Sequence, residues 1–134
     1  MKNWIESHIE DGSKILKKPV LFTEFGKSSK DPRFNTGERD NLFDAVYKHV
    51  YGSASRGGAV GGAMFWQLMA EGMRSYGDGY EIVLSHNPST AALIASQSRK
   101  LAELTRILTT LNEYEKMLVP AHRRVRWHWK SIRG

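Results

Sequence analysis

The fold is decided by one segment, Lys18-Pro19-Val20-Leu21-Phe22-Thr23-Glu24-Phe25-Gly26-Lys27-Ser28. Its apolar run follows Pro19 and shows no alternation with polar residues, which predicts a strand buried on both faces. Gly26 then allows a tight turn after the run. We therefore expect a central parallel strand that carries Glu24 at its C-terminal end.

Glu24 has two interpretations at that position. In α/β barrels, residues at the C-terminal ends of the strands act on ligands more often than they serve packing. A carboxylate there can also cap a turn or pair with a neighbouring lysine or arginine, as structural charges do. The segment alone does not decide between these two roles.

A second short apolar run favours the first role. It is Gly61-Gly62-Ala63-Met64-Phe65-Trp66-Gln67-Leu68. Between the two runs, residues 38–54 show apolar side chains at helical spacing. Strand, helix and strand in this order form a parallel β-α-β unit, which brings Glu24 and Trp66 to the same rim. A carboxylate beside an indole is typical of a sugar site, where the ring stacks on the sugar and the carboxylate addresses the anomeric carbon.

Several linked motifs carry a family resemblance. They are Phe22-Thr23-Glu24-Phe25-Gly26-Lys27-Ser28, Arg56-Gly57-Gly58, Phe65-Trp66-Gln67-Leu68 and Asp78-Gly79-Tyr80-Glu81-Ile82-Val83-Leu84. From about Trp4 to about Leu104 the chain resembles the C-terminal part of plant endo-β-1,4-mannanases, retaining enzymes of glycoside hydrolase family 5. The resemblance implies a (β/α)8 TIM barrel that hydrolyses internal β-1,4-mannosidic bonds in mannans. It also implies that Glu24 is the nucleophile, at the end of the seventh strand, and that Trp66 binds substrate at the end of the eighth.

The length limits how much of that barrel is present. The chain has 134 residues, whereas a complete barrel needs about 250. We therefore expect an α/β fold that is a partial TIM barrel, with only the seventh and eighth strands and their flanking helices. The helices are expected over residues 2–16, 38–54 and, after Asn87-Pro88, to about residue 111 or beyond.

The same limit applies to the chemistry. Retaining hydrolysis needs two carboxyl groups roughly 5–5.5 Å apart. In the resembled family, the acid/base glutamate follows an asparagine at the end of the fourth strand, and this chain has no counterpart. Asp78 and Glu81 invite a second-carboxylate hypothesis, but the resemblance gives neither that role. The expectation is a weakly active or inactive mannanase-like chain with a mannan-type polysaccharide as substrate, and no cofactor or metal.

The C-terminal residues differ from the rest in charge. We expect two parts, a barrel portion over residues 1–111 and a basic tail over residues 112–134. The five basic residues after Val119 account for most of the formal net charge of +6, and Trp127 and Trp129 lie among them. Three hypotheses stay open for the tail: a solvated and disordered terminus, which is favoured, a segment that binds nucleic acid or an anionic membrane, and sequence outside the fold.

A rival function and the location follow from these features. The rival is a non-catalytic carbohydrate- or nucleic-acid-binding fragment that uses Trp66 and the tail, although neither nucleic acid nor a membrane is the expected partner. No cysteine is present, so disulfides and thiolate chemistry are excluded. The N-terminus lacks the apolar region of a signal peptide, whereas the resembled family is secreted, so the location is left open.

Overall fold

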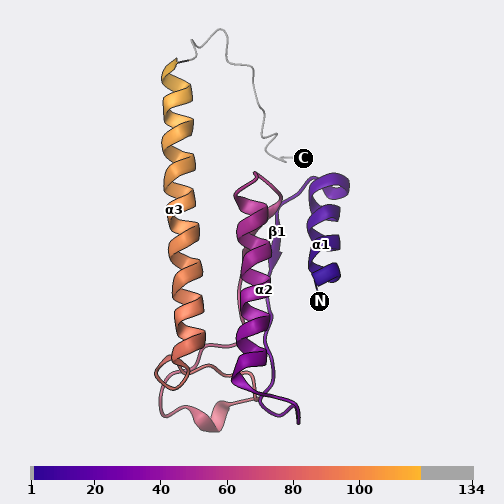
Figure 1. The fold of residues 1–134 in the computed structure, drawn as a ribbon, viewed down its shortest axis with the longest axis vertical. Coiled ribbons are helices and arrows are strands. Elements are labelled where there is room, and N and C mark those ends of the chain that lie inside the picture. Colours follow the sequence, from indigo (N-terminus) through magenta and orange to yellow (C-terminus); the bar gives the residue numbers. More distant parts are fainter. Residues whose placement is uncertain (1, 119–134) are drawn as a thin grey trace. The chain divides into compact units, whose positions relative to one another are not determined.

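The computed structural model describes residues 2–118, so the expectations for the basic residues after Val119 lie outside the described residues. The chain divides into two compact units, Met1–Leu101 and Ala102–Gly134. The elements, shown in Figure 1, are α1 (Lys2–Glu10), η1 (Asp11–Leu16), β1 (Val20–Phe22), α2 (Thr36–Ala54), β2 (Val60–Ala63), η2 (Arg74–Tyr76), η3 (Leu84–His86) and α3 (Pro88–Leu118). The expected boundary at residue 111 stays a prediction.

The first unit is built around the parallel β-α-β unit that the sequence predicts. β1 and β2 pair in parallel, with α2 between them in the chain. Leu21 lies opposite Gly62 and Phe22 opposite Ala63, with one irregularity in register between Val20 and Leu21. The fold is therefore of the mixed α/β class. Two strands joined by a helical crossover are the smallest parallel sheet.

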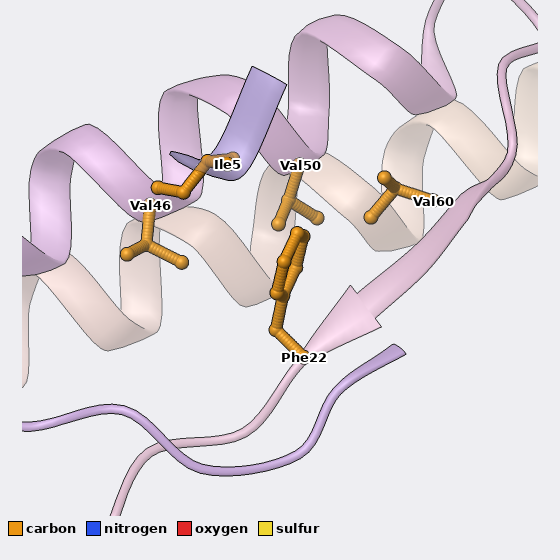
Figure 2. Close-up of a cluster of buried hydrophobic side chains, with 5 residues drawn as sticks. All are labelled: Ile5, Phe22, Val46, Val50 and Val60. Carbon is orange, nitrogen blue, oxygen red and sulfur yellow. The ribbon is translucent and has the colours of Figure 1, made fainter. Parts of the chain in front are cut away.

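The core lies between the sheet and the helices on one of its faces. Figure 2 shows the Phe22 ring of β1 directed toward Val50 of α2, with Val46, Val60 and Ile5 around it. The α2 helix begins two residues before the expected Glu38. The side chain of Asn35 caps it by accepting a hydrogen bond from the Glu38 amide at 2.8 Å, which satisfies one orphan donor of the first turn.

The opposite face of β1 is open. Leu21 is 52% exposed, so the expectation of a strand buried on both faces is wrong for this residue. Successive strand side chains point to opposite faces, and α1 and α2 contribute core residues only on the Phe22 face. Within the described residues, the sheet has two strands. Covering the Leu21 face would need further elements.

The helix expected over residues 2–16 changes geometry on the way to β1. It is α-helical to Glu10 and π-helical over Asp11–Leu16, and it ends at Lys17 in a left-handed conformation. Gly12 is buried, and a Cβ atom built there would lie 2.2 Å from Cγ2 of Val20. The glycine is thus required by the close approach of the helix end to β1.

The α3 helix starts at Pro88, as predicted. Within the first unit it is tied to α2 by Arg39, which is buried and donates to Thr90 Oγ1 at 3.2 Å and to Asn87 Oδ1 at 2.5 Å. Thr90 in turn donates to Asp40. This polar network satisfies a buried guanidinium, which would otherwise be costly.

The described part of the second unit is the remainder of α3. Its side chains from residue 105 to residue 118 are exposed. Ion pairs join Glu103 to Arg106 and Glu113 to Lys116, each across one helical turn. Among the described residues, no helix combines the length and the apolar character that crossing a membrane requires.

Candidate functional site

The two strand ends that carry Glu24 and Trp66 are hydrogen-bonded neighbours. The pairing continues past the formal strands, since Met64 N donates to Phe22 O at 2.8 Å and Trp66 N donates to Phe25 O at 2.9 Å. The sequence prediction that both residues reach one rim is therefore met at the level of the backbone, because the residue bonded to Trp66 is the one that follows Glu24.

Two phenylalanines determine which side chains face outward. Phe25 and Phe65 both pack on Phe43 of α2, with ring centroids 4.8 Å and 5.5 Å away. Because neighbouring side chains in an extended chain alternate, anchoring these rings in the core turns Glu24 and Trp66 away from it. Both are exposed. Neither anchor was predicted from the sequence, although an aromatic residue next to each functional candidate is a visible signal.

Gly26 lies at the rim for a different reason from the one predicted. Its φ is not positive. A Cβ atom there would instead lie 2.5 Å from the carbonyl oxygen of Trp66 and 3.0 Å from the Tyr80 ring. Gly26 is therefore needed for the close approach of three chain segments, and any side chain would separate them.

The side chain of Glu24 is exposed at this rim. Within residues 2–118, its carboxylate has no hydrogen-bond or ion-pair partner, which leaves the turn-capping and ion-pairing alternatives without support. The nearby Lys27 pairs with Glu38 at 3.4 Å instead. An exposed, unpaired carboxylate is free to contact a ligand.

Trp66 has a fixed polar contact. Its indole N–H donates to Oδ2 of Asp78 at 2.6 Å, while the residue remains 44% exposed. The peptide bond from Trp66 to Gln67 is cis. The indole hydrogen bond, followed by one from the Tyr80 amide, holds the pKa of the Asp78 carboxyl below its usual value of 3.8. Asp78 is therefore a carboxylate at neutral pH.

The long connection over residues 69–86 folds back onto the rim. Leu68 and Ile82 form a parallel bridge, with Ile82 N donating to Gln67 O at 2.8 Å and Met69 N to Ile82 O at 3.0 Å. Ile82 is buried in the second core cluster with Phe43. The short extended piece around Ile82 thus packs the connection against the core, whereas the side chain of Tyr76 is largely exposed.

The two carboxylates raised as second catalytic groups have structural roles in this loop. Glu81 accepts the amide N–H of Gly79 at 2.7 Å. Asp78 has a lowered pKa, whereas a general acid needs a raised one. Neither suits the acid/base role. Among the described residues, no three His, Cys, Asp or Glu side chains lie close enough to hold a metal ion.

The chain is similar to plant mannanases along much of its length. It is 40% identical over 134 residues to mannan endo-1,4-beta-mannosidase 7 of Arabidopsis thaliana, covering all of this chain and 28% of that protein. It is 55% identical over 102 residues to mannan endo-1,4-beta-mannosidase 2 of rice, covering 76% of this chain and 23% of that protein. The chain corresponds to a part of a protein of the mannan endo-1,4-β-mannosidase family. The chain spans only about a quarter of the length of these glycoside hydrolase relatives.

Two other comparisons add less. A solved structure, the endo-beta-1,4-mannanase from Thermotoga petrophila, matches 74% of this chain and 21% of its own, with 30% identity and a TM-score of 0.49. No family model matches the chain. The membership in the mannosidase family therefore rests on the sequence relatives.

Asp78 has a contact that was not predicted from the sequence, because its carboxylate accepts the hydrogen bond of the Trp66 indole. The signal that could have found this is the Asp78-Gly79-Tyr80 order. Aspartate before glycine favours a turn in which the carboxylate accepts the amide two residues on, and Tyr80 N donates to Asp78 Oδ1 at 2.9 Å.

Proposed function

We propose that this chain supplies the part of an endo-β-1,4-mannanase cleft that carries the nucleophile and one sugar-stacking ring, and that it corresponds to the seventh and eighth strands of a partial (β/α)8 barrel. Glu24 would attack the anomeric carbon of a mannosyl unit, and Trp66 would stack on the sugar. The relatives named mannan endo-1,4-beta-mannosidase support the substrate class. The observation that carries the proposal is an unpaired, exposed carboxylate on the strand end that is hydrogen-bonded to Trp66.

Turnover by the 134 residues alone should be low. A retaining mechanism needs a second carboxyl group to protonate the leaving oxygen and later to deprotonate water. Asp78 is held ionised and Glu81 is bonded to the backbone, so neither meets this need. Loss of general acid–base help alone costs about 10²–10⁴-fold in rate. We expect binding of mannooligosaccharides with little hydrolysis of galactomannan.

An activated substrate separates the nucleophile from the missing acid. In 2-deoxy-2-fluoro-mannosyl fluoride, the C1–F bond breaks without protonation of the leaving group. The Glu24 carboxylate oxygen then forms a bond to C1, fluoride departs, and the fluorine at C2 slows hydrolysis of the ester. We expect the full chain incubated with this reagent to gain one glycosyl group, which peptide mass spectrometry should locate at Glu24.

The controls are two glutamine variants. Glu24→Gln should abolish labelling, because the amide is a poor nucleophile. Glu10→Gln changes an exposed carboxylate on α1 and should leave labelling unchanged. Labelling at another residue, or none under conditions in which the chain is folded by circular dichroism, would contradict the proposal.

A further inference from the structure

The indole N–H of Trp66 is already occupied by the protein. It donates to one oxygen of Asp78 at 2.6 Å, and the other oxygen of the same carboxylate accepts the amide of Tyr80 at 2.9 Å. A hydrogen bond to an ionised acceptor is about twice as strong as a neutral one. The carboxylate thus links the ring of Trp66 to the backbone of the returning loop.

That loop is itself held in place near Asp78. The amide of Gly79 donates to Glu81 Oε2 at 2.7 Å, and the carbonyl of Gly79 accepts from Ser29 N at 2.6 Å. The carbonyl of Tyr80 accepts from Gln67 N at 3.2 Å. Gly79 has φ +101°, a conformation that other residues rarely adopt. The acceptor for the indole therefore sits on backbone that is bonded to both neighbouring segments.

We infer that Asp78 is a positioning residue that fixes the Trp66 ring so that it can offer a sugar only its exposed face. This inference rests on the proposed function, in which Trp66 lines the mannan site. With the N–H occupied, Trp66 cannot donate a hydrogen bond to a sugar hydroxyl. Recognition through this residue would then depend on contact between the ring and the C–H groups of the pyranose, which suits an amphipathic aromatic side chain.

The hydrogen bond to the indole distinguishes Asp78 from another aspartate of the rim loops. Among residues 2–118, the indole N–H has this one acceptor. Asp31 offers a close comparison, because it is also on a rim loop, also accepts a backbone amide, from Arg33 at 2.9 Å, and also has a lowered pKa, chiefly from that bond. Within the described residues no hydrogen bond joins Asp31 to Trp66, so Asp31 separates loop capping from indole positioning.

The test uses the full chain and four variants, Asp78→Ala, Asp78→Asn, Asp31→Ala and Trp66→Ala. The first readout is the NMR signal of the Trp66 indole N–H, assigned by its loss in Trp66→Ala, with its rate of exchange with solvent. The second is the affinity for mannohexaose by calorimetry. Circular dichroism of each variant, at the temperature of the NMR and calorimetry measurements, verifies that it is folded.

The inference predicts a graded pattern. Asp78→Ala should shift the indole signal, speed its exchange at least about tenfold and weaken mannohexaose binding several-fold. Asp78→Asn should retain part of both properties, because one amide oxygen can still accept the indole bond while its NH2 group cannot accept from Tyr80. Asp31→Ala should change neither readout.

The outcomes separate this inference from the proposed function. If Trp66→Ala weakens binding and Asp78→Ala does not, the positioning role is overturned and the proposed function stands. If Trp66→Ala leaves binding unchanged, the proposed role of Trp66 fails, and the inference fails with it. Unchanged indole exchange in Asp78→Ala overturns the inference whatever the binding data show.

Discussion

At the scale of single residues, buried polar side chains of the first unit differ in whether they have hydrogen-bond partners. Arg39 is buried and bonded to Asn87 and Thr90. Gln97 on α3 is 8% exposed, and its amide nitrogen is the one buried side-chain nitrogen or oxygen atom among the described residues that lacks a hydrogen-bond partner. An unmet buried donor costs about 1–3 kcal/mol of stability. Gln97 is therefore a weak point of the packing between α3 and α2.

Removing this donor should stabilise the fold. Gln97→Leu replaces the amide by an apolar group of similar size, and the two residues have similar helix propensity. We expect the free energy of unfolding in urea to rise by about 1 kcal/mol with an unchanged m-value. Ser98→Leu, at an exposed position of the same helix, is the control and should gain only a few tenths of that. A loss of stability in Gln97→Leu would show that the amide has a partner in solution.

At the scale of elements, one glycine determines how the first helix meets the sheet. Gly12 lies where α1 passes into the π-helical turns, against Val20 of β1. A methyl group there would need to displace the side chain of Val20. The helix end and β1 are thus packed at a distance that only glycine permits.

Alanine substitutions at two helical glycines should therefore have opposite effects. Gly12→Ala should lower the free energy of unfolding by about 1–3 kcal/mol, as overpacking does. Gly52→Ala in α2 would meet only the end of the Arg56 side chain, at 3.4 Å, and should stabilise by up to about 1 kcal/mol through helix propensity. Chemical denaturation of both variants measures the difference. Equal effects would mean that the approach of the helix to Val20 is looser than described.

The elements that the sequence predicted are those with local causes. Apolar spacing indicated α2, and two short apolar runs between turn residues indicated β1 and β2. The π-helical turns and the extended piece around Ile82 depend on tertiary contacts and had weak local signals. The exposure of Leu21 could not be predicted from an apolar run, because burial of a face depends on elements elsewhere in a fold.

The candidate site shows the same division. Glu24 and Trp66 could be placed on one rim because the C-terminal ends of parallel strands share an edge. The bond between Trp66 and Asp78 could not be predicted in the same way, since Trp66 lies at a strand end and Asp78 lies on the irregular connection that follows it. Periodicity in a sequence indicates the residues that lie on helices and strands. Contacts within loops depend on hydrogen bonds, which periodicity does not indicate.

At the scale of the first unit as a whole, the open face of the sheet is the dominant liability. Gly62 lies opposite Leu21, so Met64, two residues further along, is on the same face as Leu21. Leu21 and Met64 are 52% and 50% exposed. A two-stranded sheet with unpaired edges and an apolar face is marginal by itself and prone to pair with other chains.

This face should drive association of the isolated chain. We expect sedimentation velocity over the micromolar to millimolar range to show concentration-dependent self-association. The double variant Leu21→Lys/Met64→Lys should suppress it, because charge on an exposed strand opposes edge and face pairing. Ile15→Lys changes a residue of η1 that is 72% exposed and is the control, which should associate like the parent chain. If Ile15→Lys suppresses association equally, general surface apolarity is responsible and the sheet face has no special role.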